Sequence, residues 1–118
     1  MHELSIASSV VSAVEQARAE QSLGSVALVR LRVGRMSGVL PESLRFCWDL
    51  ATEHTGLAGA ELDIVVTEPQ LRCAKCGAVA AFEAARDRCP ACGARGFEIE
   101  GGMDLMIESL EIREDKPS

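Results

Sequence analysis

Four of the five cysteines in this 118-residue chain lie in two pairs of identical spacing. Each pair has the form Cys-x-x-Cys, and twelve residues separate Cys73 and Cys76 from Cys89 and Cys92. Two such pairs turn four sulfurs toward one tetrahedral point, as in structural four-thiolate zinc sites. A glycine directly follows each pair, where a tight turn favours a residue without a side chain. The spacing therefore predicts one Zn(II) ion held by four thiolates.

Two other chemistries of paired cysteines fit less well. A thioredoxin-like redox site needs a single Cys-x-x-Cys on a helix that follows a strand, and neither pair has that setting. An iron–sulfur cluster would use the same four thiolates, but the symmetric pairs with their glycines favour zinc. A module of about 30 residues buries little apolar surface, so a bound metal would be its main source of stability.

The composition is that of a globular protein, with 47% apolar and 25% charged residues. No apolar run approaches the roughly 20 residues that cross a bilayer, and the N-terminus lacks the basic and apolar segments of a signal peptide. We therefore expect a cytoplasmic protein that does not contact a membrane. A net charge of −6 and only four aromatic residues disfavour binding to nucleic acid.

Hydrophobic periodicity predicts two helices and two strands before residue 70. Apolar residues recur at helical spacing over 4–21 and alternate over 26–33, as in a half-buried strand. Pro41 suits the first turn of a second helix, which Gly56 ends. Residues 61–67 alternate again. Because a helix connects the two strands, we expect them to be parallel.

A third strand is expected at 103–113. Its apolar parity changes between Ile107 and Leu110, which predicts a β-bulge or a strong twist near Glu108 and Ser109. The predicted fold class is α/β (α+β): two helices on a small three-stranded mixed sheet, with an inserted zinc-ribbon-like module.

The cysteine module interrupts the larger domain. We assign residues 1–69 and 101–118 to an α/β domain and residues 70–100 to a zinc-binding module. Residues 70–96 carry a charge of +3, which leaves −9 for the remainder, and that remainder suits a divalent cation or a basic partner. Gly101 and Gly102 follow the module, and we hypothesise that they permit it to reorient.

Three single residues need an interpretation. Cys47 lies on the apolar stripe of the second predicted helix and is interpreted as core. We expect His54 in the last turn of that helix, where the dipole favours a partly charged imidazole. His2 precedes the first predicted helix, where backbone amides need no partner within a helix. Composition alone would make it part of a disordered terminus.

Several segments together resemble the HypA/HybF family of nickel metallochaperones. They are the opening MHELSIA, the GRMSGV that precedes PESLRF, the paired cysteines and the closing SLEI. The resemblance runs over essentially the whole chain, and it changes the interpretation of His2.

The resemblance implies a protein that carries Ni(II) as transient cargo during maturation of nickel–iron hydrogenases and is not an enzyme. It implies structural Zn(II) on the four paired cysteines. It places Ni(II) on His2, through the imidazole and backbone nitrogens, with the backbone nitrogen of Glu3 alongside. Residues 1–69 and 101–118 would then form the nickel-binding domain. The implied partners are the nickel-handling GTPase of the same pathway and the hydrogenase large-subunit precursor. We expect a monomer or a weak homodimer.

The fourth nickel donor stays open between the Met1 amine, Glu42, water and a ligand from a partner. Ni(II) in square-planar geometry favours nitrogen donors. Some family members have an aspartate near the nickel, in the loop before the second helix. Here that loop carries only Glu42, which we interpret as a first-turn acid stabilised by the helix dipole.

The alternative function is a zinc-ribbon adaptor that binds protein or nucleic acid. Its surface would be formed by the basic residues of the module, which are Arg72, Lys75, Arg86, Arg88 and Arg95. The acidic remainder and the scarcity of aromatics disfavour this function. An enzyme is also disfavoured, because four thiolates leave no open position for water on zinc.

Overall fold

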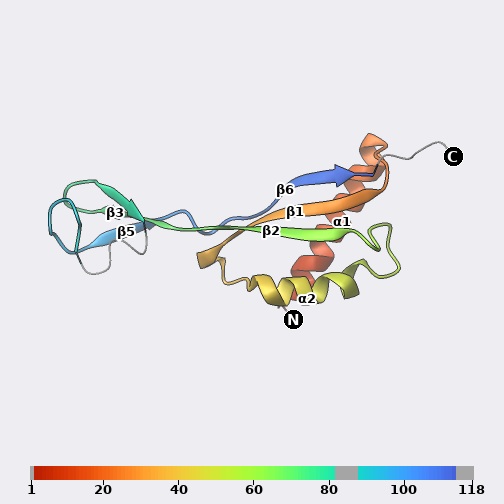
Figure 1. The fold of residues 1–118 in the computed structure, drawn as a ribbon, viewed down its shortest axis with the longest axis horizontal. Helices are drawn as coiled ribbons and strands as arrows, with labels where there is room; N and C mark the ends of the chain where they lie inside the picture. Colours follow the sequence, from red (N-terminus) through yellow and green to blue (C-terminus); the bar gives the residue numbers. More distant parts are fainter. Residues whose placement is uncertain (1, 82–87, 114–118) are drawn as a thin grey trace.

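The computed structural model describes residues 2–81 and 88–113 and contains two sheets joined end to end (Figure 1). The molecule is elongated, with principal extents of 64 × 30 × 21 Å. Its elements are, in order, α1 (His2–Gln21), β1 (Val26–Gly34), the 3-10 helix η1 (Arg35–Ser37), α2 (Pro41–Thr52), β2 (Glu61–Thr67), β3 (Gln70–Cys73), β4 (Val79–Ala81), β5 (Phe97–Glu100) and β6 (Leu105–Ile112). Neither helix in the described residues has the length and apolar character that crossing a membrane requires.

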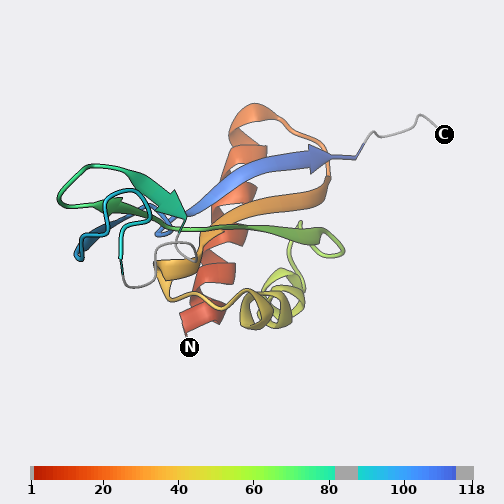
Figure 2. The same cartoon turned by 60° about the vertical axis from the view of Figure 1, so that its left-hand side comes forward.

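The larger sheet has the strand order β2-β1-β6. β1 is parallel to β2 and antiparallel to β6, so the sheet is mixed. α1 and α2 lie on one face, with α1 crossing behind the strands in Figure 2. Together with the cysteine module, this arrangement confirms the predicted α+β fold class.

One apolar core joins both helices to the larger sheet. Val11 of α1, Leu44 and Trp48 of α2, and Val29 and Leu31 of β1 are all buried in it. The helical spacing and the strand alternation that predicted these elements arise because each element turns one apolar face toward this core.

β6 contains the predicted bulge. Ser109 and Ile107 pair with consecutive residues of β1, so Glu108 between them has no partner on that strand. The extra residue lets both Ile107 and Leu110 face the helices, although an odd number of positions separates them. The parity change in the sequence is therefore a real change of register.

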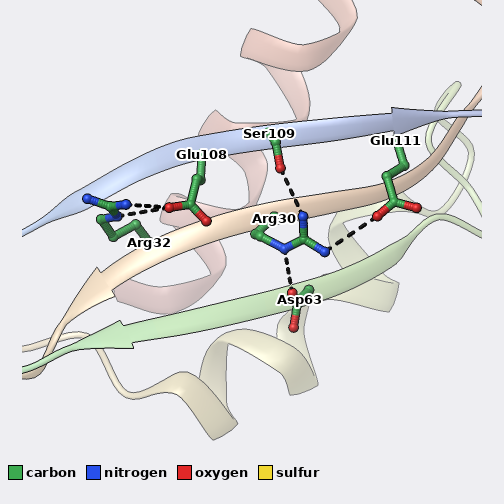
Figure 3. A network of polar contacts seen from close by, with 6 residues as sticks. All are labelled: Arg30, Arg32, Asp63, Glu108, Ser109 and Glu111. Carbon is green, nitrogen blue, oxygen red and sulfur yellow. Dashed lines mark hydrogen bonds and ion pairs between the residues drawn. The ribbon is translucent and has the colours of Figure 1, made fainter.

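The face of the larger sheet opposite the helices carries a network of ion pairs (Figure 3). Arg30 of the central strand donates to Asp63 on β2 at 2.7 Å and to Ser109 on β6 at 3.2 Å. Arg32 donates through Nε to the bulge residue Glu108 at 3.1 Å. The outward positions of β1 thus connect all three strands through their side chains.

α2 ends earlier than predicted. The helix stops at Thr52, whose hydroxyl donates to the carbonyl of Trp48 at 3.0 Å, and does not extend to Gly56. His54 follows with a left-handed backbone (φ 63°) and an exposed side chain, 3.6 Å from the Glu53 carboxylate. His54 therefore lies beyond the helix and not in its last turn, because the backbone already leaves the helical conformation at Glu53, whose ψ is 132°.

The smaller sheet has the order β4-β3-β5 and is antiparallel throughout. Periodicity did not predict its strands, because a strand of three or four residues contains too few alternations. The buried apolar residues of the described part of 70–100 are Leu71, Cys73 and Cys89. Two of these three are cysteines, so the described part of the module buries little hydrocarbon.

The two sheets meet at a tightly packed backbone junction. Met36 donates its N–H to the carbonyl of Gly102 at 2.7 Å. A Cβ on Gly34 would lie 2.0 Å from the same carbonyl oxygen, and Gly102 also packs against the buried Pro69. Gly101, in contrast, has open space around it and a φ of 74°. Of the two glycines predicted to permit a reorientation of the module, only Gly101 is free of this packing, and the reorientation itself stays a prediction.

Candidate metal centres

The four paired cysteines converge. Their sulfur atoms all lie within 4.8 Å of one another. The Sγ atoms of Cys73 and Cys92 are 3.7 Å apart, and those of Cys76 and Cys89 are 3.6 Å apart. Four sulfurs bonded to Zn(II) at about 2.3 Å in a tetrahedron lie about 3.8 Å from one another. Donor type and spacing therefore both fit a tetrahedral thiolate site.

The two cysteine pairs fold in the same way. Gly77 donates to the carbonyl of Cys73 at 2.9 Å, and Gly93 donates to that of Cys89 at 2.8 Å. Both glycines have a left-handed φ, 76° and 77°, which explains their place after each pair. Backbone N–H groups also point at the sulfur of the first cysteine in each pair, at 3.4 Å and 3.3 Å.

These contacts separate the pKa values of the thiols. The backbone N–H of Cys76 contributes most to lowering the pKa of Cys73 to about 6, and backbone N–H groups also lower the pKa of Cys89. The N–H of Ala78 lowers the pKa of Cys76, but hydrogen bonds with Cys89 and Cys92 raise it to about 12. A bound cation favours the thiolate form of each ligand, so metal binding to this cluster releases protons.

Among the described basic residues of the module, Arg72 differs from the others. Arg72 is paired with Glu100 across the small sheet, with Nη2 and Oε2 3.2 Å apart. Arg86 lies outside the described residues. Lys75, Arg88 and Arg95 are exposed. Of the five residues predicted to form the adaptor surface, these three are therefore both described and exposed.

The sequence predicts that His2 precedes the first helix, and this prediction is wrong: His2 is the first residue of α1. The helix begins at His2, and the imidazole is exposed. The first four N–H groups of an α-helix have no acceptor inside the helix. The backbone nitrogens of His2 and Glu3 are among them, so both nitrogens are available although both residues belong to the helix.

The side chains of Glu3 and Glu42 both lie near the start of α2. The Glu3 carboxylate accepts a hydrogen bond from the N–H of Leu40 at 3.4 Å, at the start of α2. Glu42 is exposed in the first turn of α2, and Met1 lies outside the described residues. Within residues 2–81 and 88–113, only the four cysteines bring three or more His, Cys, Asp or Glu donors together.

His2 also lines a cleft that sequence reasoning missed. The cleft lies between α1 and β6, has a volume of about 550 Å³ and is largely apolar. Ser5, Ser9 and Ala13 form much of its α1 wall, since residues four apart lie on one side of a helix. The sequence signal for this cleft is the series of small residues four positions apart on α1, because larger side chains there would fill the cleft.

Comparisons with known proteins cover the whole chain. A family model described as "Hydrogenase/urease nickel incorporation, metallochaperone, hypA" matches residues 1–112. The chain is 41% identical to a hydrogenase maturation factor HypA from Roseiflexus sp., covering 99% of this chain and 96% of the relative. It is 42% identical to that of Chlorobaculum tepidum, covering 95% and 99%. The fold is similar to the solution structure of the Ni metallochaperone HypA from Helicobacter pylori, with a TM-score of 0.63, 22% identity and coverage of 93% and 96%.

Proposed function

Because the chain belongs to the HypA family of nickel metallochaperones, we propose that it binds Ni(II) at its N-terminus and delivers the ion during maturation of a nickel–iron hydrogenase. The observation that carries this proposal is the place of His2. Its imidazole is exposed in the first turn of α1, where backbone N–H groups have no helical acceptor. The protein transfers an ion and is expected to have no catalytic turnover.

The nickel ligands in this proposal are nitrogen atoms. The His2 imidazole and the backbone nitrogens of His2 and Glu3 supply three donors of the kind that square-planar Ni(II) favours. Two deprotonated amides would balance the charge of the ion. The positive end of the helix dipole would then not repel the bound metal. The Glu3 side chain is engaged with Leu40, which favours a role for the nitrogen of Glu3 over its carboxylate. The fourth donor comes from the Met1 amine, Glu42, water or a partner.

The metal in the cysteine cluster is proposed to be Zn(II), held by Cys73, Cys76, Cys89 and Cys92. Its chemistry is structural, because four thiolates complete a tetrahedral shell. The sulfur spacing and the aligned backbone N–H groups support this assignment. The ion would stabilise a module whose described part buries little hydrocarbon.

The members of this family named hydrogenase maturation factors act on other proteins. For this chain we propose two partners, the nickel-handling GTPase of hydrogenase maturation and the precursor of the hydrogenase large subunit. Transfer from an exposed site suits such contacts, because a shallow three-nitrogen site leaves a coordination position for the recipient.

The test is metal analysis with Ni(II) titration of the zinc-loaded protein, without any N-terminal tag. We expect one zinc per chain and one nickel, and we expect His2→Ala to abolish the nickel while zinc content and the circular dichroism spectrum stay unchanged. His54→Ala is the matched control, because His54 is the other histidine and is also exposed. Unchanged nickel affinity in His2→Ala, or equal losses in both variants, would remove the assignment.

A further inference from the structure

β6 forms an edge of the larger sheet, and apolar side chains are exposed along it. Within the described residues, β6 pairs with β1 on one side only. Leu105, Met106 and Ile107 expose 45%, 53% and 36% of their surface. An edge strand with free backbone N–H and C=O groups can pair with a further strand. Exposed apolar residues beside it supply the contacts that such pairing needs.

The α1/β6 cleft lies on the helix side of this edge. Leu105 and Ile107 line it from β6, and Ser5, Ser9 and Ala13 line it from α1. α1 therefore leaves the inward side of β6 partly uncovered. A strand placed next to β6 would direct every second side chain toward α1, where the cleft has room for apolar groups.

The other face of the same edge is acidic. The two arginines of the open sheet face pair with four carboxylates, those of Asp63, Asp104, Glu108 and Glu111. With Asp104 added to the residues drawn in Figure 3, this network has an excess of two negative charges. Glu111 on β6 keeps 58% of its side chain exposed. The outward side chains of an added strand would meet these acids, and basic residues complement them.

A second copy of this chain is a poor occupant of the edge. Antiparallel pairing of two β6 strands would bring the Glu108 and Glu111 carboxylates of both copies together. Like charges at facing positions destabilise strand pairing. The charge pattern therefore favours a different chain.

We propose that the β6 edge binds an extended segment of a partner protein, in which apolar and basic residues alternate, as a fourth strand of the larger sheet. The apolar side chains enter the α1/β6 cleft, and the basic ones face Glu108 and Glu111. His2 lines the same cleft. The segment would therefore lie beside the cargo, and this last consequence rests on the nickel site proposed above.

The test uses the full zinc-loaded chain without nickel and synthetic peptides as probes. The first peptide alternates valine and lysine, the second alternates valine and glutamate, and the third has the composition of the first with its lysines in one block. Titration calorimetry should show binding of the first peptide and at least about tenfold weaker binding of the other two. Equal binding of the blocked peptide would mean attraction to net charge only, and the proposal would fall.

Three variants place the binding on this edge. Ser9→Phe fills the cleft and should weaken the first peptide by at least about tenfold, which is 1.4 kcal/mol. Ser8→Phe is the matched control, because Ser8 is exposed on α1 but does not line the cleft. Glu111→Lys should weaken the first peptide and strengthen the glutamate peptide. Equal effects of Ser8→Phe and Ser9→Phe in variants with unchanged circular dichroism would overturn the proposal.

Two further measurements separate this proposal from the nickel site. Binding of the first peptide by the zinc-loaded wild type, with no nickel bound by that same protein, would retain the docking edge and remove the nickel function. Nickel bound through His2 with no binding of the first peptide would do the reverse. Sedimentation that shows a dimer dissolved by Ser9→Phe would make a second copy the occupant and refute the partner segment.

Discussion

The larger and the smaller sheet each have three strands, yet different interactions hold them together. β1 has nine residues and β6 has eight, and an apolar core from both helices covers one face of their sheet. β3 has four residues and β4 has three, and four sulfurs converge beside them. The comparison shows that a large packed area can order one part of a chain, while a few well-placed metal ligands can order another.

Removing the metal should produce the largest difference between the two regions. With a chelator, or in Cys89→Ala, residues 70–100 should lose their amide dispersion in nitrogen–proton spectra, because little else orders them. The larger sheet should persist, with unchanged fluorescence of Trp48, the single tryptophan, which is buried in its core. Cys47→Ala is the matched control. This variant should keep the zinc of the protein, because Cys47 is buried in α2 and does not belong to the four-cysteine cluster. Loss of both regions together would mean that they fold as one unit.

The converse experiment perturbs the apolar core. Leu44→Ala should lower the free energy of unfolding of the larger part by about 2–5 kcal/mol, because it leaves a cavity in the core. Zinc content should not change. Leu50→Ala on the same helix should change that free energy by less than about 0.5 kcal/mol, since Leu50 is 61% exposed. Urea titration followed by Trp48 fluorescence measures both, and equal costs would contradict the burial described here.

The junction offers a third test. Gly34→Ala should lower the free energy of unfolding by about 3 kcal/mol, because its Cβ would overlap the carbonyl of Gly102. The backbone of Gly34 has a φ of −75°, which any residue adopts, so the cost measures the close approach alone. Gly101→Ala should cost only about 1 kcal/mol, the strain of a left-handed alanine in open space. If thermal unfolding ranks them the other way, Gly34 and Gly102 are not in contact.

The smallest expected effect concerns pH. Hydrogen bonding to Arg72 lowers the pKa of Glu100 below its usual value, 4.5. A carboxyl with a depressed pKa stabilises the fold above its unfolded pKa, and this contribution is lost as the pH falls through the folded pKa. In Arg72→Gln the pKa of Glu100 should rise, and the small sheet should become less sensitive to pH below 4.5. A carboxyl carbon titration by NMR measures this pKa, and no change would contradict the ion pair.

A matching substitution can be made in the larger sheet. Arg30 occupies the central strand there, as Arg72 does in the small sheet, and pairs with Asp63. Arg30→Gln should move the melting temperature only slightly, since both side chains of the pair remain partly open to solvent, at 32% and 46% exposure. A large loss of stability would show that the open-face network contributes more than such exposed pairs usually do.

Local patterns determined much of this protein. The spacing of the paired cysteines predicted a cluster that the structure brings together, and periodicity predicted both helices and all three strands of the larger sheet. The parity change in 103–113 even indicated the bulge at Glu108. These features follow from neighbouring residues, because side-chain direction repeats along a helix or strand with a fixed period.

Other features arose only in the tertiary structure. The tight approach of Gly34 to Gly102, and the contact between Glu3 and the start of α2, join residues far apart in the sequence. The cleft beside His2 exists because Ser9 and its small neighbours face the edge strand β6. Periodicity indicates which face of an element is apolar, but the neighbour of that face depends on how the strands pair. The pairing is fixed by long-range contacts, and so only the folded chain decided that β1 is the central strand and that β2 and β6 lie at the edges.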